Sequence, residues 1–306
     1  MYRTRTHADG IGLRYGMKKY IQVLITNPLK RCYLPSLLLL IGTSQLSHAN
    51  DNLLIDLQGE VMQGSLMVGK TLPGNQVYLD DRALKVSRHG LFTFGFSRDD
   101  EHSYQLKLVN GDKQQIKTLE PAKREYKIQR VNGIAKKIME PDPNDVARAR
   151  KDSKQIGEVR NIASDSIDFA HGFIAPSKGR ITGVYGSQRV YNGKPGNPHY
   201  GLDYAGKTGT LVQAPAAGIV TLWVPDMFYS GGTLVIDHGH GVTSTFLHLS
   251  GSLVTEGDKV LQGQNVAKIG STGRSTGPHL DWRINWFNVR LDPALVLKLP
   301  NMHTFQ

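Results

Sequence analysis

Residue types suited to metal chemistry recur in three short stretches of this chain. "HYGLD" holds His199 and Asp203, "FLHLS" holds His248, and "GPHLDW" holds His279 and Asp281. In an extended strand, side chains two positions apart point to the same face, so His279 and Asp281 would share one face. Each stretch alone is weak evidence, because a lone strand histidine is more often a packing residue and short His/Asp pairs arise by chance.

The elements around these stretches are typical of an antiparallel β-domain. From about Asp168 to about Leu297, short apolar strands such as "GIVTLWV", "GTLVIDH", "VTSTFLHL" and "QNVAKIG" alternate with glycine-rich turns. Neither a long helix nor an alternation of strands and helices is expected there. The pattern therefore predicts an all-β domain, a sandwich or a rolled sheet.

Two further segments precede this domain. Residues 50–130 predict a small β accessory domain, because "QVYLDDRALKVSRHGLFTFGF" alternates apolar and polar residues and "NGD" suits a hairpin turn. Residues 131–167 predict a linker with one exposed helix, since "PDPNDVARARKDSKQIGEVRN" opens with prolines and is then polar. We expect no catalytic group in the small β-domain and interpret His89 as a solvated turn residue.

The N-terminus predicts an export signal. Residues 1–49 combine a basic stretch, the apolar run "CYLPSLLLLIG" and small residues before a cut near Ala49. The alternative is an uncleaved membrane anchor, although the apolar run is shorter than the roughly 20 residues that a spanning helix needs. We therefore expect an exported protein of the periplasm or cell envelope, without Cys32 and hence without a disulfide.

Removal of this segment also changes the charge. The whole chain has a formal net charge of +11, and residues 1–49 hold seven basic residues and one acidic residue, so the remainder carries +5. This mild charge gives no reason to expect nucleic acid as a partner. It suits an anionic polymer such as the cell wall, although mild positive charge is usually only a solvated surface.

The ordered set of motifs resembles the LytM/lysostaphin-like zinc metallopeptidases of the M23 family. The stretches that carry the resemblance are "GRITGVYGSQR", "PHYGLDYA", "APAAGIVTL", "TSTFLHLS" and "VTEGDKVLQGQNVAKIGSTGRSTGPHLDW". They cover roughly residues 168–297. The resemblance implies a LytM-like peptidase domain over residues 168–306.

The resemblance also implies a role for each candidate residue. It implies Zn²⁺ ligands at His199, Asp203 and position 281, and two catalytic histidines, His248 and His279, that are not ligands. Hydrolytic zinc needs three protein ligands and one open position for water, whose pKa the metal lowers. Nearby imidazoles then orient the water, take its proton and stabilise the oxyanion.

Asp281 departs from the family, which has histidine at this position. Carboxylate oxygen is a normal zinc ligand, but a second carboxylate leaves a less positive centre that acidifies water less and favours harder ions. Alternatively, Arg283 shares the strand face of Asp281, and the two could form an exposed ion pair without a metal, worth about 0–1 kcal/mol. Both interpretations remain open at this point.

Other candidate positions have simpler explanations. His238 and His240 in "DHGHG" are interpreted as turn residues between two strands, away from any metal. Trp282 and Trp286 are interpreted as core residues, with sugar stacking as the lesser alternative.

The leading hypothesis is a secreted zinc metalloendopeptidase that hydrolyses peptide cross-links of bacterial peptidoglycan, whose peptide stems would be its partner. The alternative is a degenerate member of the family that binds peptidoglycan or activates another cell-wall hydrolase without cutting.

Overall fold

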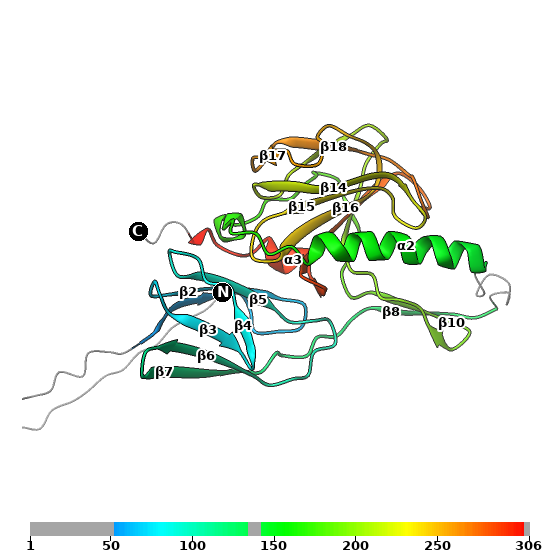
Figure 1. Ribbon diagram of the computed structural model, residues 1–306. Helices are drawn as coiled ribbons and strands as arrows, with labels where there is room; N and C mark the ends of the chain where they lie inside the picture. Colours follow the sequence, from blue (N-terminus) through cyan, green and yellow to red (C-terminus); the bar gives the residue numbers. More distant parts are fainter. Residues whose placement is uncertain (1–51, 134–141, 303–306) are drawn as a thin grey trace, which may run out of the picture. The chain divides into compact units, whose positions relative to one another are not determined.

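The computed structural model describes residues 52–133 and 142–302 (Figure 1). The predicted export signal over residues 1–49, with Cys32, lies outside these ranges. The described chain is mostly strand, and nearly all of its strand pairs are antiparallel. The prediction of an antiparallel all-β protein is therefore confirmed.

The segment before residue 132 holds two small sheets. The first has the order β1-β2-β5, with bounds Leu54–Gln58, Leu66–Thr71 and Leu91–Gly95. The second has the order β4-β3-β6-β7, with bounds Arg82–Leu84, Gln76–Leu79, Tyr104–Asn110 and Lys113–Leu119. Phe92, Phe94 and Phe96 are fully buried, and their alternation with smaller residues builds the core here. The "NGD" turn joins β6 to β7, as predicted.

The segment after residue 180 forms a ten-stranded sheet, which we call the central sheet. Its strand order is β17-β14-β15-β16-β19-β12-β9, and β13, β18 and β20 are added to it. The central strands of this sheet are β12 (Leu202–Ala205), β14 (Gly218–Met227), β15 (Gly231–Asp237), β16 (Val242–Ser252) and β19 (His279–Trp286). The flanking strands are β9 (Ile181–Gly183), β13 (Leu211–Gln213), β17 (Lys259–Val260), β18 (Asn265–Ile269) and β20 (Val289–Leu291).

A third, short sheet joins the two segments. β8 (Ile128–Val131) pairs in parallel with β10 (Gln188–Tyr191), which also pairs with β11 (Lys194–Pro195). Arg124 adds an ion pair of 2.8 Å between its Nη2 atom and Oδ2 of the buried Asp292. The accessory segment is thus bonded directly to the segment that carries the candidate site.

The described helices are α2 (Pro143–Arg160), the 3₁₀-helix η1 (Asp168–His171) and α3 (Pro293–Val296). Asp142 caps α2, because its Oδ1 accepts a hydrogen bond of 2.7 Å from the Asn144 amide. None of these helices combines the length and the apolar character that crossing a bilayer requires.

Helix α2 is the helix predicted within residues 131–167, but only its outer face is exposed. Asp152 Oδ2 accepts a hydrogen bond of 2.7 Å from the Phe228 amide. Arg148 Nη2 contacts the Asp226 carbonyl oxygen and carboxylate at 2.7 and 2.8 Å. Arg160, at the end of the helix, is only 4% exposed. The Asp152 hydrogen bond, with the contact of the more exposed Arg148, therefore fixes α2 to the end of β14 and to the turn that follows it.

Strand β19 has two chemically different faces. Leu280, Trp282 and Ile284 are fully buried in the hydrophobic core, where Trp282 Nε1 donates to Ser244 Oγ at 3.2 Å. His279, Asp281 and Arg283 lie on the opposite face, because side chains alternate along a strand. The interpretation of Trp282 as a core residue is confirmed, and so is that of Trp286, which is 3% exposed.

Candidate active site

Pairing of two strands brings the predicted ligand residues together. Asp203 on β12 lies directly opposite Asp281 on β19 in the antiparallel register. His199 precedes β12, and its backbone is held by hydrogen bonds of 2.8 Å to the backbone of Gly186 and Ser187. One ligand atom from each of His199, Asp203 and Asp281 lies within 4.8 Å of the other two. We call these three residues the metal centre.

Two polar atoms of the metal centre lack a hydrogen-bond partner. His199 Nε2 and Asp203 Oδ1 are both buried and, within the described chain, neither has a partner in hydrogen-bonding geometry. The two atoms are nevertheless only 3.1 Å apart. Buried polar atoms are rarely left unpaired, and imidazole nitrogen with carboxylate oxygen is a normal zinc donor set. The residues present therefore fit a zinc ion.

Two glycines make room for the carboxylates. A Cβ atom at Gly183 would lie 2.1 Å from Asp203 Oδ2, and one at Gly201 would lie 1.9 Å from Asp281 Oδ1. No other residue type fits either position without moving a carboxylate. Both glycines lie within the motif stretches "GRITGVYGSQR" and "PHYGLDYA", but the sequence pattern did not single them out.

Asp281 is ion-paired with Arg283. Arg283 Nε lies 3.1 and 3.0 Å from Asp281 Oδ1 and Oδ2, and Arg283 Nη2 lies 2.6 Å from Oδ2. The sequence predicted an exposed pair, yet Asp281 is only 2% exposed because β12 and β16 flank β19 on both sides. A carboxylate has about four lone-pair sites, so Asp281 keeps capacity for a further ligand.

Charges in the metal centre shift the pKa values of its members. Burial would raise the pKa of Asp281, but the Arg283 guanidinium outweighs burial and lowers the pKa to about 2. Burial would lower the pKa of His199, whereas the carboxylates of Asp203 and Asp281 raise it. Asp281 is therefore a carboxylate at neutral pH, as a metal ligand must be.

The two predicted catalytic histidines lie side by side. The rings of His248 and His279 have centroids 4.8 Å apart. His248 Nδ1 lies 2.9 Å from the Thr272 carbonyl oxygen, and His279 Nδ1 lies 2.8 Å from that of Gly277. A carbonyl oxygen can only accept, so both Nδ1 atoms carry the proton and both Nε2 atoms are left as acceptors. Burial lowers the pKa of His248, which keeps this ring neutral.

The other histidine pair is structural. His238 is fully buried, with Nδ1 at 2.6 Å from the Ala217 carbonyl oxygen and Nε2 at 2.8 Å from Ser244 Oγ. His240 is 2% exposed, and burial lowers its pKa to about 4. Neither residue belongs to the metal centre, in agreement with their interpretation as turn residues.

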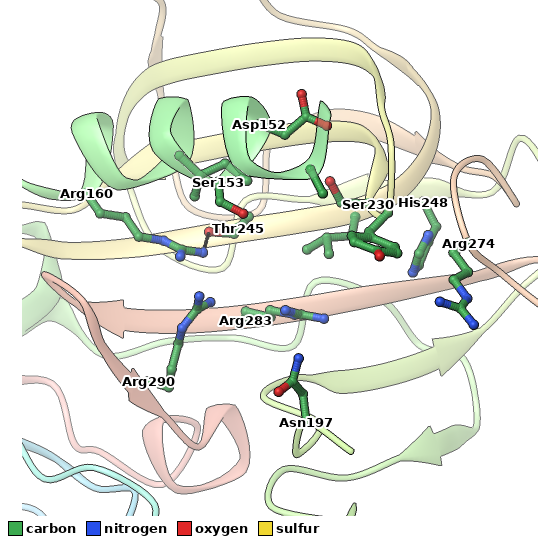
Figure 2. A pocket seen from close by; sticks show the side chains of 14 residues that line it. Asp152, Ser153, Arg160, Asn197, Ser230, Thr245, His248, Arg274, Arg283 and Arg290 are labelled. Atoms are coloured by element: carbon green, nitrogen blue, oxygen red, sulfur yellow. Dashed lines mark hydrogen bonds between the residues drawn. The ribbon is translucent and has the colours of Figure 1, made fainter. Parts of the chain in front are cut away.

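A cavity of about 400 Å³ extends from His248 between α2 and the strands of the central sheet (Figure 2). Four arginines line it: Arg160 from α2, Arg283 from β19, Arg290 from β20 and Arg274 from the loop before β19. Of these, only Arg283 was a candidate from the sequence. No sequence signal marks the other three, because residues far apart in the chain converge here only after α2 packs on the sheet.

Comparison with known proteins supports the resemblance seen in the motifs. Residues 197–293 match the model of Peptidase family M23. The chain is 36% identical over 132 residues to peptidoglycan DD-endopeptidase ShyA of Vibrio cholerae, which is 42% of this chain and 30% of that protein. It is 44% identical over 89 residues to DD-carboxypeptidase/endopeptidase Mpg of Neisseria meningitidis, which is 28% of this chain and 20% of that protein. It thus spans less than a third of the length of either relative.

A solved structure matches more of the chain. A crystal structure of a Pseudomonas aeruginosa protein assigned to peptidase M23 superposes with a TM-score of 0.60 and 24% sequence identity. The match covers 78% of this chain and 95% of that protein, which is more than the peptidase segment alone. At this identity the likeness establishes the fold.

Proposed function

Since this chain carries a peptidase M23 domain, we propose that it is an exported zinc metalloendopeptidase that hydrolyses peptide cross-links of bacterial peptidoglycan. One observation carries the proposal: His199 Nε2 and Asp203 Oδ1 are buried, unpartnered and 3.1 Å apart, with Asp281 beside them. The relative named as a peptidoglycan DD-endopeptidase supplies the substrate class.

In this proposal His199, Asp203 and Asp281 hold the zinc. When bound, the ion would acidify the attacking water and polarise the scissile carbonyl. His248 and His279 present unprotonated Nε2 atoms, because the Thr272 and Gly277 carbonyl oxygens hold the proton on Nδ1. One imidazole can therefore accept the proton of the attacking water and return it to the leaving amine, while the other orients the reacting groups.

Arg283 compensates the charge that Asp281 adds. Two carboxylates would cancel the charge of a divalent ion, whereas a site with one carboxylate and two histidines leaves a net charge of 1+. The Arg283 guanidinium, bonded to both oxygens of Asp281, restores that net charge. The bonded pair is thus as neutral as a histidine, which supports a working site despite the departure at position 281.

Zinc content and hydrolysis together test the proposal. We expect about one zinc per purified chain by elemental analysis and release of cross-linked peptides from purified peptidoglycan, read by chromatography. His89, an exposed turn residue, gives a matched control, and His89→Ala should change neither result. A metal-free protein that leaves peptidoglycan intact would reject the proposal.

The second candidate is a non-cutting module that binds peptidoglycan or activates another cell-wall hydrolase. The pairing of the buried Asp281 with Arg283 favours it, because Arg283 already contacts both carboxylate oxygens. In that case the purified chain should sediment with peptidoglycan, contain no zinc and leave the polymer intact. Stimulation of a second purified hydrolase would then identify the activating form.

Export to the cell envelope is a further part of the proposal. It is supported by the predicted signal over residues 1–49 and by the location of the polymer that the relatives act on. Fractionation of cells, followed by N-terminal sequencing of the envelope form, tests it. The proposal requires a mature end close after Ala49, and retention of the whole chain in the cytoplasmic fraction would contradict it.

A further inference from the structure

The cavity beside His248 holds an excess of positive charge. Figure 2 shows Arg160, from the end of α2, and Arg290, from β20, pointing toward each other across the space above β19. Arg283 lies beside them, and Arg274 lines the cavity near His248. We call Arg160, Arg283 and Arg290 the arginine pocket.

The fold does not neutralise this pocket. Of its three arginines, only Arg283 has a carboxylate partner among the described residues, and that partner is Asp281. Asp152 also lines the cavity, but it forms an ion pair with none of these arginines, and its Oδ2 atom accepts a hydrogen bond from the Phe228 amide. A buried cation without an anion is costly, so an arrangement of this kind implies a ligand that supplies the negative charge.

Arg160 shows this most clearly. It is 4% exposed, and its Nη2 atom donates to the neutral Thr245 hydroxyl at 3.0 Å. Its Nε atom is buried and has no hydrogen-bond partner in the described chain. Burial and the nearby Arg290 and Arg283 lower its pKa well below the usual range. Because Arg160 lines the cavity and its Nε–H group has no partner in the described chain, this group can donate a hydrogen bond to a ligand there.

Arg290 faces the same space. Its guanidinium lies 5.6 Å from the centroid of the Tyr200 ring, and no carboxylate of residues 52–133 or 142–302 pairs with it. Burial lowers its pKa to about 10, with Arg283 adding to the effect, so it stays charged at neutral pH. Two guanidinium groups that converge on one space suit a planar oxyanion, which can accept two parallel hydrogen bonds from each fork.

The position of the pocket indicates where the oxyanion comes from. His248 lines the same cavity, and Arg283 joins the pocket to the metal centre through Asp281. A ligand of the arginine pocket would therefore belong to the molecule that reacts at the candidate active site. Every peptide ends in a carboxylate and acidic residues add more, whereas phosphate is not part of a peptide.

We propose that Arg160 and Arg290 bind a free carboxylate of the substrate peptide and thereby select peptide bonds that lie close to such a group. This inference rests on the proposed function, since it names a determinant of substrate choice at the same site. It assigns to the chain a preference for anionic over amidated peptides.

Binding of a matched pair of ligands tests the inference without hydrolysis. The probes are N-acetyl-D-alanyl-D-alanine and its C-terminal amide, titrated calorimetrically into the full chain as purified and again with a chelator. We expect the acid to bind at least about tenfold more tightly than the amide, with and without the chelator. Arg290→Gln and Arg160→Gln should each remove about tenfold of the affinity for the acid and leave that for the amide unchanged.

Three controls keep the test decisive. Arg148→Gln removes an exposed arginine of the same helix that pairs with Asp226 outside the cavity, and should bind both probes as the parent does. Arg290→Lys, which keeps the charge but loses the fork, should fall between the parent and Arg290→Gln. If Arg160→Gln does not fold, by circular dichroism, the less buried Arg290 alone decides the result.

Equal affinity for acid and amide would overturn the inference, as would unchanged binding of the acid by Arg290→Gln. Inorganic phosphate is the third probe, and phosphate that competes as well as the peptide acid would show an anion site with no preference for substrate. None of these readings depends on peptidoglycan digestion, so a failure of the proposed function is recorded separately.

Discussion

The metal centre and the arginine pocket lie on the same face of one sheet and carry opposite charge. The metal centre gathers two carboxylates and an imidazole with two unpartnered atoms, His199 Nε2 and Asp203 Oδ1. The arginine pocket gathers guanidinium groups with one unpartnered donor, Arg160 Nε. A single ion pair, Asp281–Arg283, joins the two regions.

This contrast shows that buried charged groups without a partner of opposite charge can indicate which ligands a fold binds. In the accessory segment the core is built mainly of apolar side chains such as Phe92 and Phe94, and the buried Arg98 and Asp100 both have hydrogen-bond partners. On the face of β19 that carries Asp281 and Arg283, charged groups of each sign are left with buried atoms that have no partner in the described chain, namely Asp203 Oδ1 and Arg160 Nε. Such imbalance lowers stability and is retained where a ligand of the opposite charge repays it.

The largest effect is expected from loss of a metal ligand. Asp203→Ala removes one of three donors, so zinc content should fall from about one per chain to near zero and peptidoglycan digestion below detection. Elemental analysis and digestion assays measure the two quantities. Digestion at the rate of the parent by a zinc-free Asp203→Ala protein would show that the metal centre has no role in hydrolysis.

The pair that joins the two regions should have the next largest effect. Asp281→Ala leaves Arg283, whose side chain is 24% exposed, without its carboxylate beside Arg160 and Arg290. It should lower the free energy of unfolding by about 3 kcal/mol, the low end for a buried pair. The double variant Asp281→Ala, Arg283→Met removes the unpaired charge and should recover most of that loss without recovering zinc. Urea denaturation of the parent, both single variants and the double variant gives the coupling energy. A coupling energy near zero would mean that the two regions are independent.

The sequence predicted the metal centre better than the arginine pocket, for a physical reason. His199, Asp203, His279 and Asp281 lie on or next to paired strands, where spacing along the chain decides which side chains meet. The pairing of Arg283 with Asp281 followed from the same rule, but its burial did not, because burial depends on the neighbours β12 and β16.

The arginine pocket could not be derived in this way. Arg160 ends a helix and Arg290 lies on a short strand 130 positions later, and only the packing of α2 on the central sheet makes them neighbours. The predicted helix was correct as a helix, yet its polar composition indicated exposure on all sides. One polar face of α2 instead lines the cavity.

The buried, neutral histidines outside both regions should have a smaller effect, on the pH dependence of the free energy of unfolding. The pKa of His240 is lowered to about 4 and that of His238 is also lowered, in both cases by burial. Below pH 6.5 the unfolded chain binds protons that the folded chain does not, so the free energy of unfolding should fall as the pH drops from 6.5 toward 4. The stabilisation is complete above pH 6.5.

Urea denaturation at pH 7.5 and pH 5 measures this loss, which we expect to be roughly 2 kcal/mol. His199, whose pKa is raised, acts in the opposite direction, so the variant His240→Asn isolates the effect. Its loss between the two pH values should be smaller than that of the parent. An equal loss would contradict the assignment of a neutral His240.

The smallest effect is expected when one positive charge is removed from the arginine pocket. Arg160→Met removes a buried cation that lacks an anion and keeps the packing of a long side chain, so the ligand-free protein should gain about 1 kcal/mol of stability. Arg148→Met on the exposed face of α2 is the control and should gain nothing. Thermal unfolding at neutral pH measures both, and a destabilised Arg160→Met protein would show that the fold itself needs this charge.

The register of β12 against β19 also couples correct folding to assembly of the candidate site. Asp203 opposite Asp281 and Leu202 opposite Trp282 are consequences of one alignment. A slip by one residue would turn Asp281 into the core and Trp282 onto the opposite face of the strand. The misaligned chain would therefore lose the packing of its core and the metal centre together.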